Sequence, residues 1–115
     1  MAAGDIVIRG DFIFGSKSKG SPRILFGHDT LDGTNATAVA LSSYLSDITE
    51  SPIHGVVSLQ GSSSPNMDPL AVTSAVSTTT LNVYAWKANA ADNCNLEAST
   101  NNTAIVDWVV FGPSA

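Results

Sequence analysis

The sequence predicts an all-β protein, an antiparallel β-sandwich or flattened barrel of about seven to eight short strands. Stretches rich in β-branched and aromatic residues alternate apolar and polar positions, as strands with one buried face do. Clusters of Gly, Pro, Ser and Asn separate these stretches and mark turns. At 115 residues the chain is long enough for one domain that buries its own core.

The N-terminal part combines strand signals with a basic loop. Residues 4–14 have no helical period and predict one or two short strands hinged at Gly10. Residues 15–22 carry Gly, Ser, Lys and Pro and predict a flexible loop. We therefore expect an N-terminal arm with a basic loop over residues 1–22, followed by a β-sandwich domain over residues 23–115.

The middle of the chain predicts further strands and one short helical face. Residues 23–26 have strand character, and the Asp-Gly pair at 32–33 predicts a tight turn before another strand at 36–41. Residues 41–48 space their apolar side chains three and four apart, which predicts a helical face about two turns long that ends at Pro52.

Strand signals resume after this segment and are clearest near the C-terminus. Residues 53–59 alternate, a long loop covers 61–69, and 70–76 predict a weaker strand. Residues 80–87 alternate clearly, whereas residues 103–111 are apolar on both faces. The last stretch therefore predicts either a central strand or a strand that buries its second face against another subunit.

The charge distribution argues against nucleic acid and membrane as partners. Charged residues are 13% of the chain, well under the roughly 25% of typical soluble domains. The net charge is −5, although four of the five basic residues lie within the first 23 positions. The remaining body is acidic, and it would repel a phosphate backbone or an anionic lipid surface.

The sequence offers no recognisable catalytic or metal-binding motif. Cys94 is the only cysteine, so no internal disulfide or cysteine-based zinc site can form. His28 and His54 lack metal-ligand or triad spacing. Asp29 and Asp32 flank a turn but lack the repeated oxygen ligands and closing Glu of a calcium loop. We predict no catalytic residue, no metal and no cofactor, and we expect the protein not to be an enzyme.

Three polar or aromatic side chains stand out on the predicted strands. Asp107 lies among apolar neighbours, so we expect it to be hydrogen-bonded to an adjacent strand or loop. Tyr84 and Trp86 share one face of their strand, where they suit either a subunit contact or a sugar-stacking platform. The glycosylation patterns at Asn35 and Asn101 are interpreted as chance matches in a chain rich in Asn and Thr.

No targeting or membrane segment is recognisable. The first residues lack a basic segment followed by an apolar run, and no stretch approaches the roughly 18 apolar residues of a membrane span. We expect synthesis in the cytoplasm without export by a signal peptide.

The chain is short, rich in predicted strands and poor in cysteine and charged residues, it has no recognisable signal peptide, and its C-terminal strand is apolar on both faces. In these respects it resembles the capsid decoration (cement) proteins of tailed bacteriophages. That resemblance implies a compact β module, often trimeric, that clamps neighbouring capsomers on the outside of the head. It implies a virion location, contact with the major capsid protein and self-association as a homotrimer.

A second, local resemblance concerns the last strands. The segment Ile105-Val-Asp-Trp-Val-Val-Phe-Gly112, preceded by Leu81-Asn-Val-Tyr-Ala-Trp86, is similar to the end of H-type lectin-like modules. Val110 stands where those modules carry a small residue. This resemblance implies a trimer and, as the alternative function, carbohydrate recognition on a phage tail or fibre.

These expectations assign residues to three surfaces. The expected capsid-contact residues are Ile6, Ile8, Phe12, Phe14, Lys17, Lys19 and Arg23. The expected core or subunit-interface residues are Trp108, Val110 and Phe111. The residues for possible sugar stacking are Tyr84 and Trp86.

Overall fold

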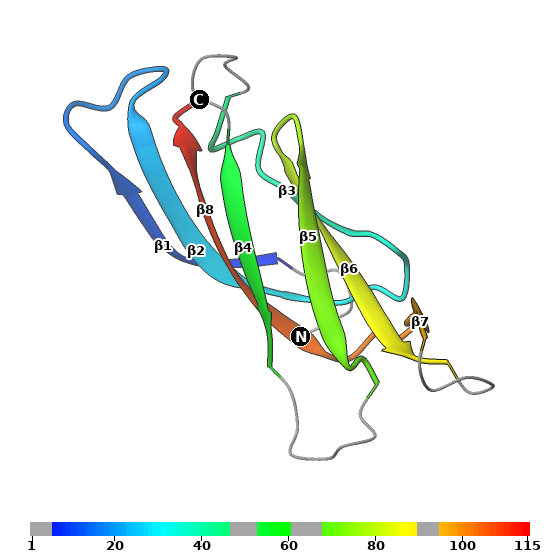
Figure 1. Cartoon of the computed structure of the whole chain (residues 1–115). Coiled ribbons are helices and arrows are strands. Elements are labelled where there is room, and N and C mark those ends of the chain that lie inside the picture. Colours follow the sequence, from blue (N-terminus) through cyan, green and yellow to red (C-terminus); the bar gives the residue numbers. More distant parts are fainter. Residues whose placement is uncertain (1–5, 47–52, 61–67, 90–94) are drawn as a thin grey trace.

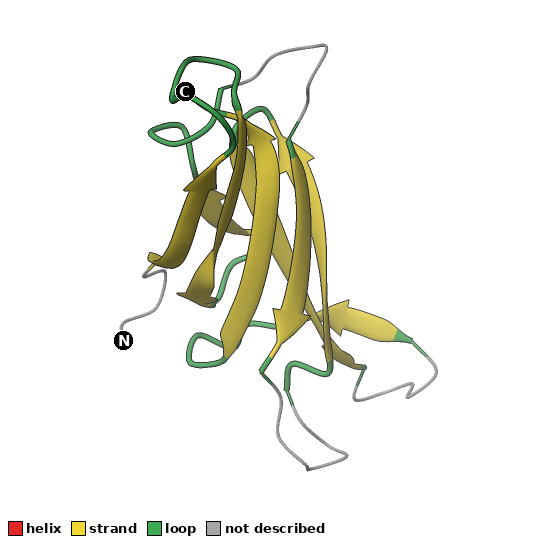
Figure 2. Ribbon diagram, turned by 90° about the vertical axis from the view of Figure 1, so that its left-hand side faces the viewer, coloured by secondary structure: helices red, strands yellow, loops and turns green. Residues whose placement is uncertain are grey.

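The computed structural model of this protein describes residues 6–46, 53–60, 68–89 and 95–115. Over these residues the chain forms eight strands and no helix, in two antiparallel sheets packed face to face (Figure 1, Figure 2). The strands in order are β1 (Ile6–Ile13), β2 (Pro22–Thr30), β3 (Thr37–Ala40), β4 (His54–Leu59), β5 (Ala71–Ser77), β6 (Thr80–Ala88), β7 (Leu96–Ala98) and β8 (Ile105–Pro113). The predicted β-sandwich is confirmed, and the described residues close no barrel.

Within the described residues, the two sheets each contain four strands. Sheet A contains β1, β2, β8 and β4 in that order, so β8 is a central strand as predicted. Sheet B contains β3, β6 and β5, and β7 pairs with the end of β6. The consecutive strands β4 and β5 belong to different sheets and lie side by side where the sheets approach each other (Figure 1). The outer faces of the two sheets therefore point to opposite sides of the molecule.

The core fills the space between the inner faces of the sheets. Alternate residues of β2, β6 and β8 point inward, as the period-2 patterns predicted. The largest fully buried hydrophobic side chains are Trp108, Leu25, Leu31, Leu41, Leu45, Leu81, Val39, Val83, Val106 and Val110. Each fully buried side chain of this size contributes about 1.5–3 kcal/mol to folding, which opposes the conformational entropy lost by the ordered chain.

The predicted N-terminal arm begins as an integral strand of sheet A. β1 pairs antiparallel with β2 along its length, so a division at residue 22/23 falls inside the β1–β2 hairpin. The register shifts between Ile8 and Gly10, which is the β-bulge form of the predicted hinge. Any side chain at Gly10 would collide with the Phe26 ring, which occupies the place of a Cβ atom. Glycine therefore lets that ring lie across β1.

The predicted helical face over residues 41–48 is wrong as an element, although its apolar positions are correct. Residues 42–44 form a turn, in which the Leu45 N–H donates to the Leu41 carbonyl at 2.9 Å. Leu45 then forms an isolated bridge with Ser114 instead of continuing a helix. Leu41 and Leu45 are both buried, so core packing uses the spacing without a regular helix. Pro52, the predicted end of the helix, and Ile48 lie outside the described residues.

Candidate functional site: the outer face of sheet A

The outer face of sheet A is unusually apolar for a surface. Because β2 and β8 alternate, each sends one set of side chains into the core and the other set outward. Six large apolar side chains on this face, between 38% and 62% exposed, form what we call the outer-face patch: Phe12, Phe14, Phe26, Val56, Val109 and Phe111. They come from all four strands of the sheet and the start of the β1–β2 loop.

The strand register sets these residues in two rows across the sheet. One row passes from Phe12 through Ile24 and Phe111 to His54, and the other includes Phe26, Val109 and Val56.

Ring stacking connects residues within one row and between the two rows. The rings of Phe12 and Phe26 lie 6.2 Å apart, and those of His54 and Phe111 lie 5.3 Å apart, both in stacked geometry. Such contacts restrict the rings and present a preformed surface.

The exposed area is large for a protein of this size. At these exposed fractions, four phenylalanines and two valines expose roughly 600 Å² of apolar surface, the upper end of the largest patches found on monomers. One side of a standard protein interface covers about 800 Å², of which somewhat more than half is apolar. The outer-face patch with a polar rim therefore matches one side of a protein–protein interface.

The edge of sheet A is less suited to docking than its face. β1 is the edge strand, and an open edge invites another strand to pair with it. The bulge between Ile8 and Gly10 interrupts the edge, and the exposed Arg9 lies within it. Bulges and charges are devices that prevent edge-to-edge pairing, so the face remains the candidate contact surface.

A pocket lies at one end of this face. It has a volume of about 270 Å³ and is lined by Phe14, Gly20, Pro22, Arg23, Ile24, Phe111, Gly112 and Pro113. Phe14 and Gly20 belong to the basic loop between β1 and β2, which carries the exposed side chains of Lys17 and Lys19.

The basic loop is held in place by hydrogen bonds. The N–H of Gly20 donates to the carbonyl of Ser114, and the N–H of Ser114 donates to the carbonyl of Ser21, both at 2.8 Å. Within the loop, the Ser21 hydroxyl donates to the Ser16 carbonyl at 2.9 Å. The loop and the end of the chain thus brace each other beside the pocket.

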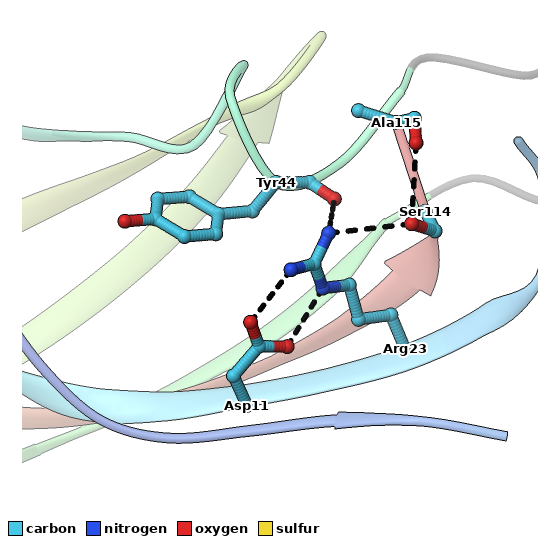
Figure 3. Close-up of polar contacts among 5 residues, drawn as sticks. All are labelled: Asp11, Arg23, Tyr44, Ser114 and Ala115. Atoms are coloured by element: carbon cyan, nitrogen blue, oxygen red, sulfur yellow. Dashed lines mark hydrogen bonds and ion pairs between the residues drawn. The ribbon is translucent and has the colours of Figure 1, made fainter. Parts of the chain in front are cut away.

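Arg23 supports this end of the molecule from inside (Figure 3). Its Nε and Nη2 donate to the two carboxylate oxygens of Asp11 at 2.7 and 2.6 Å. Its Nη1 donates to the carbonyl of Tyr44 at 2.7 Å and to the hydroxyl of Ser114 at 3.2 Å. These bonds join β1, β2, the turn after β3 and the C-terminal residues.

The ion pair changes the pKa of both residues, Asp11 and Arg23. The hydrogen bond from Arg23, together with its positive charge, lowers the pKa of Asp11 below its ordinary value against the opposing effect of burial. The hydrogen bond to Asp11 raises the pKa of Arg23 further above its ordinary value. Arg23 is only 7% exposed and its guanidinium supports the fold, so it reaches the expected contact surface only as part of the pocket wall.

The other predicted contact residues divide between the two faces. Phe12 and Phe14 belong to the outer-face patch, and Lys17 and Lys19 are exposed. Ile6 pairs with Asp29, so it lies on the inner-facing side of β1 at the sheet edge. The remaining residue, Ile8, packs against the core.

The residues expected in the core or at an interface also divide. Trp108 and Val110 are buried between the sheets, whereas Phe111 lies in the outer-face patch. Sequence reasoning missed Phe26, Val56 and Val109. The apolar second face of residues 103–111 was the available signal, but only strand pairing shows which side chains stand beside Val109.

Tyr84 and Trp86 lie on the outer face of sheet B, on the opposite side of the sandwich. Both are partly buried, and their rings stack on each other with centroids 6.5 Å apart. The Trp86 Nε1–H donates to the Thr73 hydroxyl at 2.9 Å, which fixes the indole on the sheet. This pair is a second, smaller aromatic surface.

The polar residues singled out from the sequence have structural partners. Asp107 accepts a hydrogen bond from the Gln60 side chain at 2.8 Å, as the expected contact with a neighbouring segment. The Asn35 side chain bridges the Ala85 peptide, accepting from its N–H at 3.0 Å and donating to its carbonyl at 3.3 Å. Asn101 caps its own turn, with its Oδ1 accepting from the Ala104 N–H at 2.7 Å.

The carboxylate of Asp32 accepts hydrogen bonds from residues of its own turn. Burial alone would raise the pKa of Asp32, but hydrogen bonds from Thr34 and Thr37 outweigh it and lower that pKa. Among the described residues, no three His, Cys, Asp or Glu side chains come together as a possible metal site. Cys94 lies outside the described residues.

Two further findings bear on the function of these surfaces. Within the ranges that the structure describes, no helix is long and apolar enough to cross a membrane. Searches against protein-family models, curated proteins and solved structures found no match to this chain. The function is therefore inferred from the surfaces that the strands form.

Proposed function

We propose that this chain is a non-enzymatic structural protein that binds other protein subunits through the outer-face patch, and that it decorates and stabilises a bacteriophage capsid. The observation that carries the proposal is the patch itself, which exposes roughly 600 Å² of preformed apolar surface. The resemblance to capsid decoration proteins supplies the identity of the partner, the major capsid protein, and the location in the virion.

Docking of this face would stabilise a capsid by mass action. A protein that binds only the assembled lattice lowers the free energy of the lattice relative to its separated subunits. Many copies, each bridging neighbouring subunits, add their contributions over the whole shell.

The structure changes how the contact surfaces are divided. Phe12 and Phe14, expected at the capsid, share one face with Phe111, expected at a subunit seam. We assign this common face to the capsid. The homotrimer that the resemblances imply is kept as part of the proposal, and sedimentation equilibrium of the free protein and of the protein released from capsids tests it.

Co-sedimentation with undecorated capsids tests the main proposal. We expect saturable binding, reduced more than about tenfold by Val109→Asp because a carboxylate would be buried without a partner in the interface. The control is Ala75→Asp on the outer face of sheet B, because Ala75 is exposed and lies opposite Asn82 on the outward side of β6. Equal capsid binding by both folded variants would contradict the proposal.

A carbohydrate-binding role on a tail or fibre is the second candidate, favoured by the stacked Tyr84 and Trp86. Glycan arrays and host-cell binding test it: Trp86→Ala should abolish saturable binding, whereas Val109→Asp should leave it unchanged. Binding to host cells in place of capsids would make this candidate primary. If no glycan binds, or if the Trp86→Ala variant binds normally, the candidate fails.

A further inference from the structure

The pocket beside the basic loop suggests the chemistry of the partner. It lies at the end of the outer-face patch, and its walls are mainly apolar: Phe14, Pro22, Ile24, Phe111 and Pro113. Arg23 also lines it, but its donors are engaged by Asp11, Tyr44 and Ser114. The walls therefore offer contact area with little unsatisfied hydrogen-bonding capacity.

The size of the pocket suits one side chain. Sites for small molecules and cofactors usually have volumes of about 300–1,000 Å³ and several converging polar groups. This pocket, at about 270 Å³, lies at the lower limit of that range, and its walls are mostly apolar. The residues that dominate the binding energy of protein interfaces are often large aromatic side chains that fill well-packed, desolvated pockets on the partner.

The charge on the loop beside the pocket indicates what surrounds that side chain. Lys17 and Lys19 are exposed on the loop between the lining residues Phe14 and Gly20. In the described part of the chain, the ion pairs join Arg23 to Asp11 and Lys87 to Glu97. Lys17 acts on Asp11 through its charge but forms no ion pair with it, and Lys19 takes part in neither of these pairs. Their positive charges are available to carboxylates of a partner.

We propose that the pocket receives one large apolar side chain from an acidic segment of the partner protein, with Lys17 and Lys19 pairing with carboxylates on either side of it. This inference rests on the proposed function, because it names the partner chemistry at one end of the docking face. The hydrogen bonds that hold the loop to Ser114 keep the pocket formed before binding, which reduces the ordering cost.

Selection from a random-peptide library displayed on a surface tests the inference. We expect enrichment of peptides that carry Phe, Trp, Leu or Met flanked by Asp and Glu. A fluorescently labelled enriched peptide is then titrated with the folded protein, and its affinity should fall as salt is raised. Failure to enrich peptides, or enrichment of peptides without acidic residues, would overturn the inference.

Variants locate the peptide on the protein. Phe14→Ser should weaken binding more than about tenfold because it removes a pocket wall. Val56→Ser is the matched control, because Val56 is similarly exposed on the same face but does not line the pocket. If both variants bind the peptide with unchanged affinity, the pocket is not the site and the inference is wrong.

Charge variants test the lysines. Lys17→Gln and Lys19→Gln should each weaken binding about two- to fivefold, as expected for exposed ion pairs, whereas Lys87→Gln in sheet B should not. Phosphatidylserine vesicles form a separate arm, since two lysines beside exposed phenylalanines also suit an anionic membrane. Vesicle binding that Lys17→Gln weakens, without peptide binding, would assign the surface to lipid.

The experiments distinguish a failure of the pocket inference from a failure of the proposed docking face. If peptides do not bind but Val109→Asp still abolishes capsid binding, only the inference about the pocket is wrong. If Val109→Asp leaves capsid binding unchanged, the proposed docking face is wrong.

Discussion

At the scale of single residues, Arg23 shows how a charged side chain is accommodated in a buried position. Its guanidinium donates to both carboxylate oxygens of Asp11, to a backbone carbonyl and to the Ser114 hydroxyl. A buried charge is tolerated only when its hydrogen bonds are made, and the bidentate geometry suits the planar guanidinium. The same bonds link segments far apart in sequence, so Arg23 stabilises the end of the molecule where the pocket lies.

Asp11→Asn tests this role. The variant leaves the Arg23 charge without its partner, and we expect a loss of about 1–2 kcal/mol of unfolding free energy, reduced from a fully buried pair because Asp11 is partly exposed. Urea denaturation measures it. Asp107→Asn, on β8, is the control and should change stability by less than about 0.5 kcal/mol.

The difference in stability between the wild-type protein and Asp11→Asn should change with pH in one direction. The folded state lowers the pKa of Asp11 from 3.8, so the carboxylate contributes stability above that value. The contribution disappears as pH falls through the lower, folded-state pKa. The wild-type protein should therefore exceed Asp11→Asn in stability at neutral pH, and the gap should close in strong acid. A gap that is constant with pH would show that the carboxylate charge is unimportant.

At the scale of the strands, period-2 alternation separates the core from the docking face. On β4, Gly55 points inward at Leu81 of sheet B, whereas Val56 points outward into the outer-face patch. A Cβ at Gly55 would lie 2.6 Å from a methyl carbon of Leu81, too close for normal packing. Glycine at this position therefore allows sheet A and sheet B to approach.

The pair Gly55→Ala and Val56→Ala tests the alternation. Gly55→Ala should lower the unfolding free energy by about 1–3 kcal/mol because the added methyl overpacks the core. Val56→Ala should lower it by less than about 0.5 kcal/mol, since Val56 is 62% exposed. Thermal and urea unfolding check both values, and a larger loss from the outward-facing change would refute the assignment of the faces.

At the scale of the whole molecule, the sandwich presents two aromatic surfaces on opposite sides. The outer-face patch lies on sheet A, and the pair Tyr84 and Trp86 lies on sheet B. Because the core separates them, a substitution on one face should leave binding by the other unchanged. This separation is what allows the capsid and carbohydrate candidates to be tested independently.

Removal of residues 1–13 tests whether β1 is a detachable arm. The truncation removes the edge strand of sheet A, the Ile8 side chain from the core and Asp11 from Arg23. We expect a loss of more than about 3 kcal/mol, a large part of the 5–15 kcal/mol typical of a domain. Circular dichroism and urea denaturation measure it. An unchanged unfolding midpoint would support a boundary near residue 22.

The sequence by itself determined the all-β class, most strands and the inward set of each clear strand, because alternation is a local property that needs no knowledge of neighbours. It also located Asp107 beside a neighbouring segment. The helix predicted over residues 41–48 is wrong because apolar residues spaced three and four apart can also pack a single turn against the core.

Only the tertiary structure decided that Phe12 and Phe14 stand on the same face as Phe111, and that Arg23 is buried and paired with the partly exposed Asp11. Strand order and register bring together residues up to about a hundred positions apart, and a shift of one residue would move a side chain to the other face. A docking surface that spans four strands is therefore invisible along the chain until the strands pair.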